Sequence, residues 1–506
     1  MSTTLPTPPP RADLNDSVYT ALREGLARAG YFKEAIAEYL QLGSLSQFFD
    51  GRAPDTFTTD VTSPLSALCQ SFLIGRAMEP ALLRANLGDA FVDAGLEAGL
   101  LLPVNVDGTD ALAAAASVYP VEDFWMASER VSFFPGSGQT KPYRDVVYPA
   151  ATRGVEVFLR FLPRRPCNRF LEACGGCGPA AVVASVFAKQ TVSSDLEPRS
   201  AAFAAFNGRL RGLSNFSSVA GPYYEGTEGQ FDCIAAHPPY MPNLGEFQTY
   251  YGGGPDGTEV LRGLVAGLEE RLAPGGLFYA ETIIPRLGGK PYAEVLRDWI
   301  GAAADQFDVG VFVLTPYTNS TLAMNATVKG GRGIAYQSRL LECWQQEGIT
   351  EFALCVAYIW RHEEPGVPID CHRVITESTK WEDLLAVLEW ERKRNEPAVL
   401  QQLMESPVVA SPSLRIHSVH EARNGELVNL SVKAVVNEPL HAEGPIDQWM
   451  AFLFARADGS RTGQELMAGL IEDGVVPPDT PPEQFAHLLA GLVGVGFLLQ
   501  PTCLAP

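Results

Sequence analysis

The sequence has few basic residues, no long apolar run and no dense framework of cysteines. Its 38 lysines and arginines stand against 59 aspartates and glutamates, which gives a net charge of −21. A surface this acidic repels the phosphates of nucleic acids and of anionic lipids, so neither a nucleic acid nor a membrane is the expected partner. No apolar stretch approaches the ~18 residues that indicate a membrane-spanning helix. Nine cysteines, an odd number scattered over the chain, predict free thiols in a reducing compartment.

Several motifs of known chemistry are also missing. The chain contains no Gly-x-Ser-x-Gly sequence, which argues against an esterase of that type, and no Walker A sequence. Its start, MSTTLPTPPP, has neither a charged beginning nor an apolar core, so it predicts a short disordered lead rather than a signal peptide. These absences favour a cytoplasmic protein. The pair His417 and His420 lacks further ligands nearby, so no metal site is expected.

The chain is too long for one hydrophobic core, with 506 residues of which 46% are hydrophobic and 19% charged. Changes in periodicity divide it into segments. Residues 1–13 are the disordered lead, and residues 14–130 predict a helical, winged-helix-like accessory domain. Residues 131–365 hold the main α/β domain, residues 366–440 a connecting α+β region, and residues 441–506 a small helical, winged-helix-like domain.

Strand and helix patterns alternate through the main domain. Short apolar strands are expected at 169–173, 191–194, 231–236 and 277–284, and helices at 147–162, 180–188, 199–211, 258–272 and 291–304. Such alternation is typical of a doubly wound α/β sheet. Two further strands are expected at 307–314 and 351–358, and the long excursion between them is a candidate wall of a substrate pocket.

A glycine-rich turn with the sequence EACGGCG follows the first strand at 172–178. Glycine lets a turn bring its backbone close to a ligand, and the helix N-terminus behind the turn offers free N–H groups. Cys174, Gly176 and Gly178 are therefore candidate binding residues. Glu172, at the strand end, would repel a phosphate but suits a cationic amino-acid group, such as the ammonium of S-adenosylmethionine.

The second strand ends at Asp195, which Leu196 follows. An acidic group about twenty residues after the glycines can accept hydrogen bonds from both hydroxyls of a ribose. NAD-binding enzymes share this feature, so Asp195 leaves the cofactor open, and Glu172 favours S-adenosylmethionine. Cys174 and Cys177 have the C-x-x-C spacing of metal and redox sites. No second ligand pair lies near them, and small residues in a tight turn are the simpler explanation.

A second motif, His237-Pro238-Pro239-Tyr240, directly follows the apolar strand at 231–236. Ligands of open α/β sheets bind beyond the carboxyl ends of strands, and two prolines there end the strand. The carbonyl of Pro238 can accept a hydrogen bond from a substrate N–H and so orient the nitrogen. The ring of Tyr240 can stack on a planar group or on a sulfonium.

With these motifs, residues 150–315 resemble a class I S-adenosylmethionine-dependent methyltransferase of the Asn-Pro-Pro-Tyr type, the group that includes the release-factor glutamine N5-methyltransferases. The sequences GGGPDG at 252–257 and LAPGG at 272–276 are similar to further landmarks of that group. The resemblance implies a Rossmann-like domain, S-adenosyl-L-methionine as the cofactor, and catalysis by His237, Pro238 and Tyr240.

The chain departs from the family pattern at specific positions. Cys174 replaces the first turn glycine, and His237 replaces the asparagine that holds the nitrogen to be methylated. A histidine there can accept a hydrogen bond or take a proton near neutral pH; alternatively, it only caps the strand end. The family's acidic residue near the adenine is missing, and Tyr223 or Tyr224 is a candidate to pack on the ring instead. Tyr143 and Tyr148 are candidates to cover the cofactor, with core packing as the alternative.

These features favour a methyltransferase that acts on a nitrogen, or an oxygen, of a small molecule or peptide in specialised metabolism. One alternative keeps the cofactor: if His237 faces its amino-acid part, the amine there could close a four-membered ring to give azetidine-2-carboxylate and methylthioadenosine. A second alternative is amino-methylation of a nucleic acid or protein, and a third is a binding module without turnover. The acceptor and the oligomeric state stay open.

Overall fold

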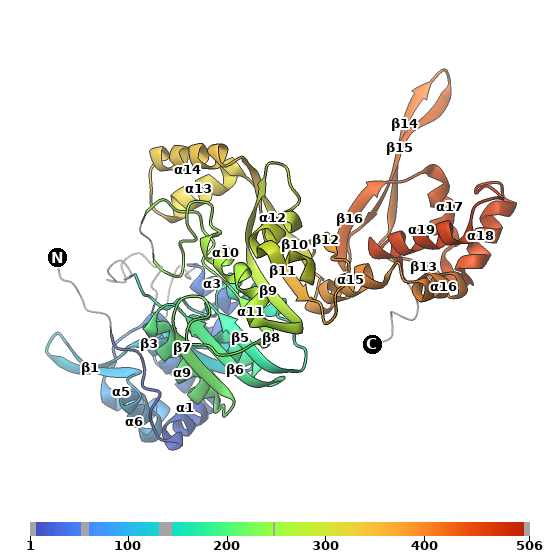
Figure 1. Ribbon diagram of the computed structural model, residues 1–506. Helices are drawn as coiled ribbons and strands as arrows, with labels where there is room; N and C mark the ends of the chain where they lie inside the picture. Colours follow the sequence, from blue (N-terminus) through green and yellow to red (C-terminus); the bar gives the residue numbers. More distant parts are fainter. Residues whose placement is uncertain (1–6, 52–59, 131–143, 246–247, 500–506) are drawn as a thin grey trace. The chain divides into compact units, whose positions relative to one another are not determined.

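The computed structural model describes residues 7–51, 60–130, 144–245 and 248–499 (Figure 1). The chain divides into two units. The first, called the core unit, comprises Met1–Pro291, Val295–Gln306 and Tyr317–Gly366. The second, called the C-terminal unit, comprises Tyr292–Glu294, Phe307–Pro316 and Val367–Pro506.

The central sheet of the core unit has its strands in the order β7-β6-β5-β8-β9-β11. Neighbouring strands are parallel except for β9 and β11, which are antiparallel. The order reverses beside β5, the first of these strands in the chain, which confirms the doubly wound α/β class. The strands are β5 Cys167–Ala173, β6 Ala188–Asp195, β7 Phe216–Ala220, β8 Phe231–Ala236, β9 Leu272–Leu287 and β11 Ile349–Arg361.

The helices that connect these strands begin and end at signals in the sequence. Proline occupies the first turn of α8 Pro179–Ala184 and of α9 Pro198–Arg211, where its missing N–H would have no partner. α9 ends at Gly212, whose φ of +80° suits glycine. The expected helix at 147–162 is shorter, α7 Arg153–Arg160, because Thr152 is still extended with ψ of 158°. Further helices of this region are α10 Glu259–Ala266, α11 Leu268–Arg271 and α12 Tyr292–Ile300.

The excursion before β11 folds into two helices, α13 Asn319–Lys329 and α14 Ile334–Gln346, which lie side by side (Figure 1). Their buried side chains form one apolar cluster with Met241 and with strand residues such as Phe352. Trp344 is fully buried in this cluster, and its indole N–H donates to the Pro255 carbonyl at 2.8 Å. The excursion therefore supports the 252–257 loop.

Helices followed by hairpins form the first part of the core unit. The helical elements are α1 Asp16–Arg28, α2 Lys33–Tyr39, α3 Leu45–Phe49, α4 Pro64–Leu68, a π-helical turn Cys69–Ile74, α5 Pro80–Leu87 and α6 Asp89–Glu97. The hairpins pair β1 Leu101–Val106 with β2 Thr109–Ala114, and β3 Ala116–Val121 with β4 Phe124–Glu129. This segment belongs to the same unit as the central sheet.

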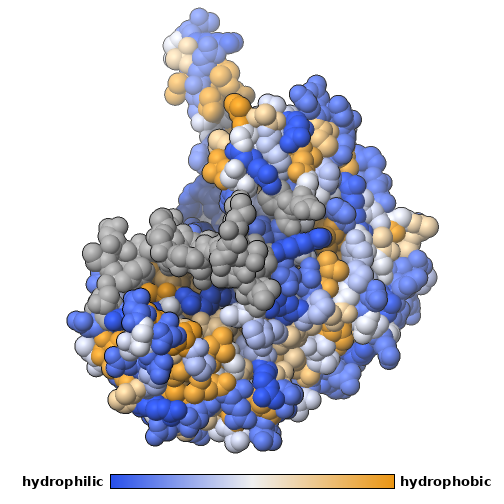
Figure 2. Space-filling view, turned by 90° about the vertical axis from the view of Figure 1, so that its left-hand side faces the viewer, coloured by the Kyte–Doolittle hydropathy of each residue, from blue (hydrophilic) through white to orange (hydrophobic). Residues whose placement is uncertain are grey.

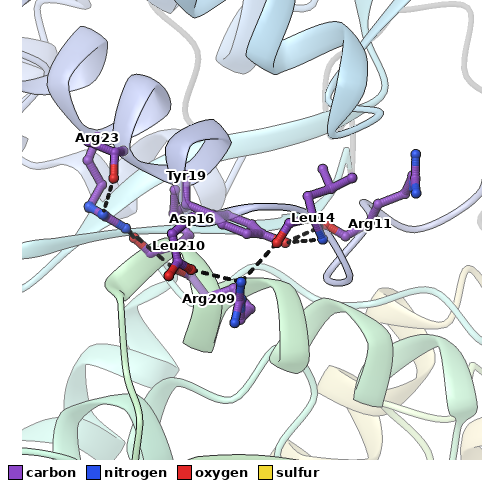
Figure 3. A network of polar contacts seen from close by, with 8 residues as sticks. Arg11, Leu14, Asp16, Tyr19, Arg23, Arg209 and Leu210 are labelled. Atoms are coloured by element: carbon purple, nitrogen blue, oxygen red, sulfur yellow. Dashed lines mark hydrogen bonds and ion pairs between the residues drawn. The ribbon is translucent and has the colours of Figure 1, made fainter.

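Hydrogen bonds from arginines of α1 and α9 connect the N-terminal segment to α9 (Figure 3). Arg209 of α9 donates to the Leu14 carbonyl at 2.9 Å and to Asp16 Oδ1 at 2.8 Å. In return, Arg23 of α1 donates to the Leu210 carbonyl at 3.0 Å. Contacts in both directions hold α1 along α9, and α9 in turn packs on β6 and β7.

Asn207 is a buried polar link between β4, α9 and the glycine-rich turn. Its amide accepts the Ala127 N–H at 2.7 Å and donates to the carbonyls of Ala127 and Cys177, each at 2.9 Å. Each buried group left without a partner costs about 1–3 kcal/mol, so Asn207→Ala is expected to lower the free energy of unfolding by several kcal/mol in denaturant titrations. The control Asn86→Ala, which removes an exposed bond to Leu82 within α5, should change it by less than about 0.5 kcal/mol. Equal losses would contradict this role.

The C-terminal unit combines strands and helices around its own core. One set of strands follows the order β14-β15-β16-β12-β10 and a smaller sheet the order β17-β13-β18. Buried apolar side chains between Leu400 and Leu498 form one cluster, which includes Leu403, Val408, Leu453 and Leu470. The strands are β10 Phe307–Thr318, β12 Asp370–Ile375, β13 Pro407–Ala410, β14 Arg415–Arg423, β15 Glu426–Val436, β16 Leu440–Pro445, β17 Asp458–Thr462 and β18 Leu498–Leu499. The helices are α15 Trp381–Lys393, α16 Pro397–Glu405, α17 Gln448–Arg456, α18 Gly463–Glu472 and α19 Pro482–Gly494.

Hydrophilic residues cover most of the face displayed in Figure 2, where apolar residues occur in separated groups. Exposed large apolar side chains include Val186, Ile334 and Val367, and scattered residues of this kind are normal at protein surfaces. Within the described ranges, we find no helix with the length and apolar character needed to cross a membrane.

Candidate functional site

A cavity of about 710 Å³ lies at the carboxyl ends of β5, β6 and β8 in the core unit, where ligands bind in doubly wound sheets. Residues of both sequence motifs line it: Tyr148, Glu172, Cys174, Gly176, Asp195, Leu196, Tyr223, His237, Pro238 and Tyr240. Gly178 lies behind this wall, where a Cβ would face Ala204. Tyr143 falls outside the described residues. The structure thus brings the turn and the His-Pro-Pro-Tyr motif into one cavity.

The turn after β5 has a backbone that favours glycine at three positions. Cys174, Gly176 and Gly178 have φ of 57°, 55° and 85°, and an L-residue in this region costs roughly 1–2 kcal/mol. Cys174, which is not a glycine, is therefore strained. A Cβ on Gly176 would meet no atom within 4 Å, so the backbone there borders open space in the cavity.

The two cysteines of the turn lack the features of a redox or metal site. Burial raises the pKa of the Cys174 thiol and raises that of Cys177 to about 12, whereas reactive thiols have a lowered pKa. In the part of the chain that the structure describes, no three His, Cys, Asp or Glu side chains gather to hold a metal ion. The turn is thus shaped by small residues.

Glu172 holds the turn against the start of α8. Its two carboxyl oxygens accept the backbone N–H groups of Ala180 at 2.9 Å and Ala181 at 2.8 Å. Burial raises the pKa of the carboxyl to about 8, against the opposing effect of these two hydrogen bonds. Because the residue also lines the cavity, a cation beside it would favour its ionised form.

Asp195 connects the end of β6 to the glycine turn. Its Oδ2 accepts the Gly176 N–H at 2.8 Å and its Oδ1 accepts the Glu197 N–H at 3.0 Å, and burial raises the pKa of the carboxyl. Beside it, Leu196 is 49% exposed and Tyr223 is 43% exposed, although both are apolar and line the cavity. An acid next to exposed apolar side chains suits a ribose joined to a flat ring.

His237 stands between two aromatic rings on the cavity wall. Its ring stacks on Phe158 with centroids 5.1 Å apart and on Tyr240 with centroids 5.8 Å apart. Burial lowers the pKa of the imidazole to about 4, so the ring is neutral near pH 7 and can accept a proton. The arrangement gives a fixed, uncharged proton acceptor at the end of β8.

The 252–257 loop clamps the backbone of the His-Pro-Pro-Tyr turn. Met241 forms a parallel bridge with Gly252, and the Gly253 N–H donates to the Met241 carbonyl at 3.0 Å. A Cβ on Gly253 would lie 2.6 Å from the Pro239 carbonyl oxygen, so no side chain fits there without displacing backbone. The glycines of the 252–257 loop therefore hold the His-Pro-Pro-Tyr turn in position.

A buried acid that the sequence motifs do not reveal lies next to His237. Glu281, on β9, is 2% exposed, and its Oε2 lies 4.0 Å from Nε2 of His237. That oxygen has no hydrogen-bond partner among the described residues, and burial raises the pKa of the carboxyl well above its ordinary value. The sequence does contain one signal for this residue, an acid inside the apolar stretch 277–284. Burying an acid without a partner costs free energy.

Sequence and structure comparisons add little to this geometry. No family model and no curated protein matches the chain. The ribosomal protein L11 methylase of Lactobacillus delbrueckii subsp. bulgaricus is 17% identical over 30% of this chain and 67% of its own, with a TM-score of 0.23. The geranyl diphosphate C-methyltransferase of Streptomyces coelicolor is 14% identical over 41% of this chain and 77% of its own, with a TM-score of 0.26. The YcgJ protein of Bacillus subtilis is 14% identical over 42% of this chain and 99% of its own, with a TM-score of 0.26. Such scores carry no argument, and the α/β fold rests on the chain's own strand order.

The rest of the cavity wall combines Tyr148 with residues that no motif indicated. Tyr148 stacks on Tyr250 with centroids 4.6 Å apart and ring planes 22° apart. Asp50 from the N-terminal segment and Lys329 from the end of α13 also line the cavity. Of the excursion's polar residues, Asn319 instead donates to the Ile349 carbonyl at 2.8 Å. The cavity is therefore lined by segments far apart in the chain. No single sequence pattern contains all of its aromatic residues.

Proposed function

We propose that this chain is an S-adenosylmethionine-dependent methyltransferase that acts on a nitrogen, or an oxygen, of a small molecule or peptide. One observation carries the proposal: a single cavity of about 710 Å³ joins the glycine turn and Asp195 to His237 and Tyr240. A binding region and a proton acceptor in one cavity are what a group transfer requires.

The residues at the turn fit S-adenosylmethionine. Asp195 would accept hydrogen bonds from the ribose hydroxyls, and Leu196 and Tyr223 would pack on the adenine. Glu172 lies on the cavity wall, beside the open backbone at Gly176. The positive charge of the amino-acid part would favour its ionised form, which would pair with that charge. When bound, this cofactor supplies an electrophilic methyl group whose bond to sulfur breaks with the electron pair left on sulfur.

The chain's own residues would orient the acceptor and take its proton. The Pro238 carbonyl accepts a hydrogen bond from the acceptor N–H, which points the nitrogen lone pair into the cavity. His237, neutral because burial lowers its pKa to about 4, accepts the proton that the nitrogen loses when the new bond forms. Tyr240 and Phe158 hold the imidazole in place by stacking.

The products of the reaction test this proposal. The purified chain is incubated with S-adenosylmethionine, alone and with a panel of small amines and peptides, and the released nucleoside is identified by mass spectrometry. We expect S-adenosylhomocysteine, released only when an acceptor is present. Methylthioadenosine from S-adenosylmethionine alone would favour ring closure to azetidine-2-carboxylate instead, which the histidine at position 237 makes the second candidate. Absence of binding in calorimetry would overturn both.

A nucleic-acid acceptor is a further outcome that the same assay can detect. Short RNA and DNA strands are included in the panel at low and high salt. The net charge of −21 opposes their binding, so we expect no salt-dependent methylation of either.

A further inference from the structure

Glu281 is a carboxyl group in a place where a charge is not tolerated without a partner. It lies in the middle of β9, opposite Val356 of β11, and is 2% exposed. An isolated buried charge costs several kcal/mol, and Oε2 has no hydrogen-bond partner among the described residues. The carboxyl is therefore neutral in the chain without a ligand.

The titratable groups around Glu281 offer it no positive charge. His237 approaches from β8, Tyr240 from the turn that follows, Tyr279 from β9 itself and Cys355 from β11. Burial lowers the pKa of His237 to about 4 and raises the pKa of both tyrosines and of the thiol, so all four are neutral near pH 7. Among the described residues, no cation is paired with this carboxyl, so a ligand bound in the cavity is the candidate source of a positive charge.

The cavity provides the place for such a charge. Glu281 is not one of the lining residues, but His237 and Tyr240 both line the cavity, and Nε2 of His237 is 4.0 Å from Glu281 Oε2. Phe158 stacks on both His237 and Tyr279, so a cation against this wall would meet the imidazole and Tyr240. The carboxyl of Glu281 lies behind them.

We propose that Glu281 is the counter-charge for a cationic ligand at the His237 end of the cavity, and that it gives up its proton when that ligand binds. The inference rests on the proposed function, in which the cation is a sulfonium. On binding, the Glu281 O–H bond breaks and the proton leaves to solvent, so the carboxylate and the cation together are neutral. After transfer, the proton lost by the acceptor nitrogen passes by way of His237 to Glu281, and the neutral carboxyl is restored. Glu281 is thus a positioning and proton-storing residue that acts through His237.

Proton release on binding is the measurement that tests this role. S-adenosylmethionine and S-adenosylhomocysteine share the adenosine and the amino acid, but only the first is a sulfonium. Each is titrated into the chain by calorimetry in buffers of different ionisation enthalpy. At about pH 6.5 the amino groups of both ligands are protonated, because an α-amino group has a pKa of about 8. Any release from Glu172 beside that ammonium is then common to both ligands and cancels in the comparison.

We expect the protein to release about one proton more when it binds S-adenosylmethionine than when it binds S-adenosylhomocysteine. This is the value for one carboxyl that changes from neutral to ionised. Glu281→Gln should abolish this difference in proton release. It should also lower the affinity for S-adenosylmethionine more than the affinity for S-adenosylhomocysteine. Glu281→Met, an apolar replacement of similar length, should do the same. A difference that survives in both variants, or equal proton release by both ligands in the natural chain, would overturn the inference. If neither ligand binds, the proposed function fails and the inference falls with it.

The ligand-free chain gives a second measurement that does not depend on binding. A carboxyl whose pKa is raised by folding holds its proton in the folded state after the unfolded chain has lost it. Its contribution to stability is therefore full below the ordinary pKa of 4.5 and is lost as the pH rises toward the folded pKa. Glu281→Gln should be more stable than the natural chain near pH 8, with a smaller gain near pH 4. A gain that is independent of pH would show that Glu281 is already ionised, which contradicts the role.

Discussion

Replacing His237 by alanine is expected to lower kcat by about 10²–10⁴-fold, the usual contribution of a general base, with little change in the affinity for S-adenosylmethionine. The imidazole lines the cavity and is the proposed proton acceptor, whereas Asp195 and the glycine turn remain intact. Kinetics with an identified acceptor give kcat, and calorimetry gives the affinity. His237→Asn should keep more activity with an amide acceptor than with an amine, because an amide side chain orients a nitrogen but cannot take its proton.

The pH profile separates a proton acceptor from a structural ring. Because burial lowers the pKa of His237 to about 4, the basic form of the imidazole is present throughout neutral pH. With S-adenosylmethionine and acceptor saturating, kcat of the natural chain should therefore fall only in acid. The control His417→Ala removes an exposed imidazole on β14 and should leave the rate unchanged. An equal loss in affinity and in kcat for His237→Ala would point instead to a collapsed wall beside Phe158.

The main strands and the positions where they end could be predicted from the sequence. Short apolar stretches followed by glycines or prolines gave β5 and β8 with their ends, and strand ends are where an α/β sheet binds ligands. Asp195 and His237 could therefore be assigned to one edge of the sheet before any coordinates. Local sequence contains this information because a strand end and its turn are set by neighbouring residues.

The role of Glu281 could not be predicted, because its partners come from other strands. An acid inside the apolar stretch 277–284 can face either side of a sheet. The parallel pairing of β9 with β8 sets Ala280 opposite Ala236 and so brings the next residues, Glu281 and His237, together. The stacking of Tyr148 on Tyr250 likewise joins segments about a hundred residues apart. Contacts of this kind depend on the packing of the whole unit, which periodicity does not report.

Glu172 shows a different limit of sequence reasoning. Its place at the end of β5 predicted a contact with a cationic group, and the structure places it on the cavity wall. The backbone N–H groups of Ala180 and Ala181 already donate to its two oxygens. A carboxylate has room for further hydrogen bonds, so binding a cation and holding α8 are compatible. The sequence could not show the second task, because Pro179 and the start of α8 must first be placed against the strand.

Replacing Gly253 by alanine should disturb the reaction end without touching a side chain of the cavity. The added Cβ would lie 2.5 Å from the Gly257 carbonyl oxygen and 2.6 Å from that of Pro239. Both are backbone atoms, which cannot turn away as a flexible side chain would, so the clamp must shift at a cost of about 1–3 kcal/mol. A displacement of about 1 Å at a reacting group can lower kcat by about 10²-fold. We expect that loss in steady-state kinetics, with binding of S-adenosylmethionine retained.

Gly333→Ala is the matched control, because a Cβ there would meet no atom within 4 Å and φ is −92°, which any residue adopts. It should leave both kcat and the free energy of unfolding nearly unchanged. The comparison decides between two roles of the 252–257 loop. If Gly253→Ala loses stability and keeps kcat, the loop only covers the excursion helices through Trp344. If kcat falls far more than the stability loss explains, the loop sets the position of the Pro238 carbonyl, and the two sequence motifs work as one site only because glycines let their backbones meet.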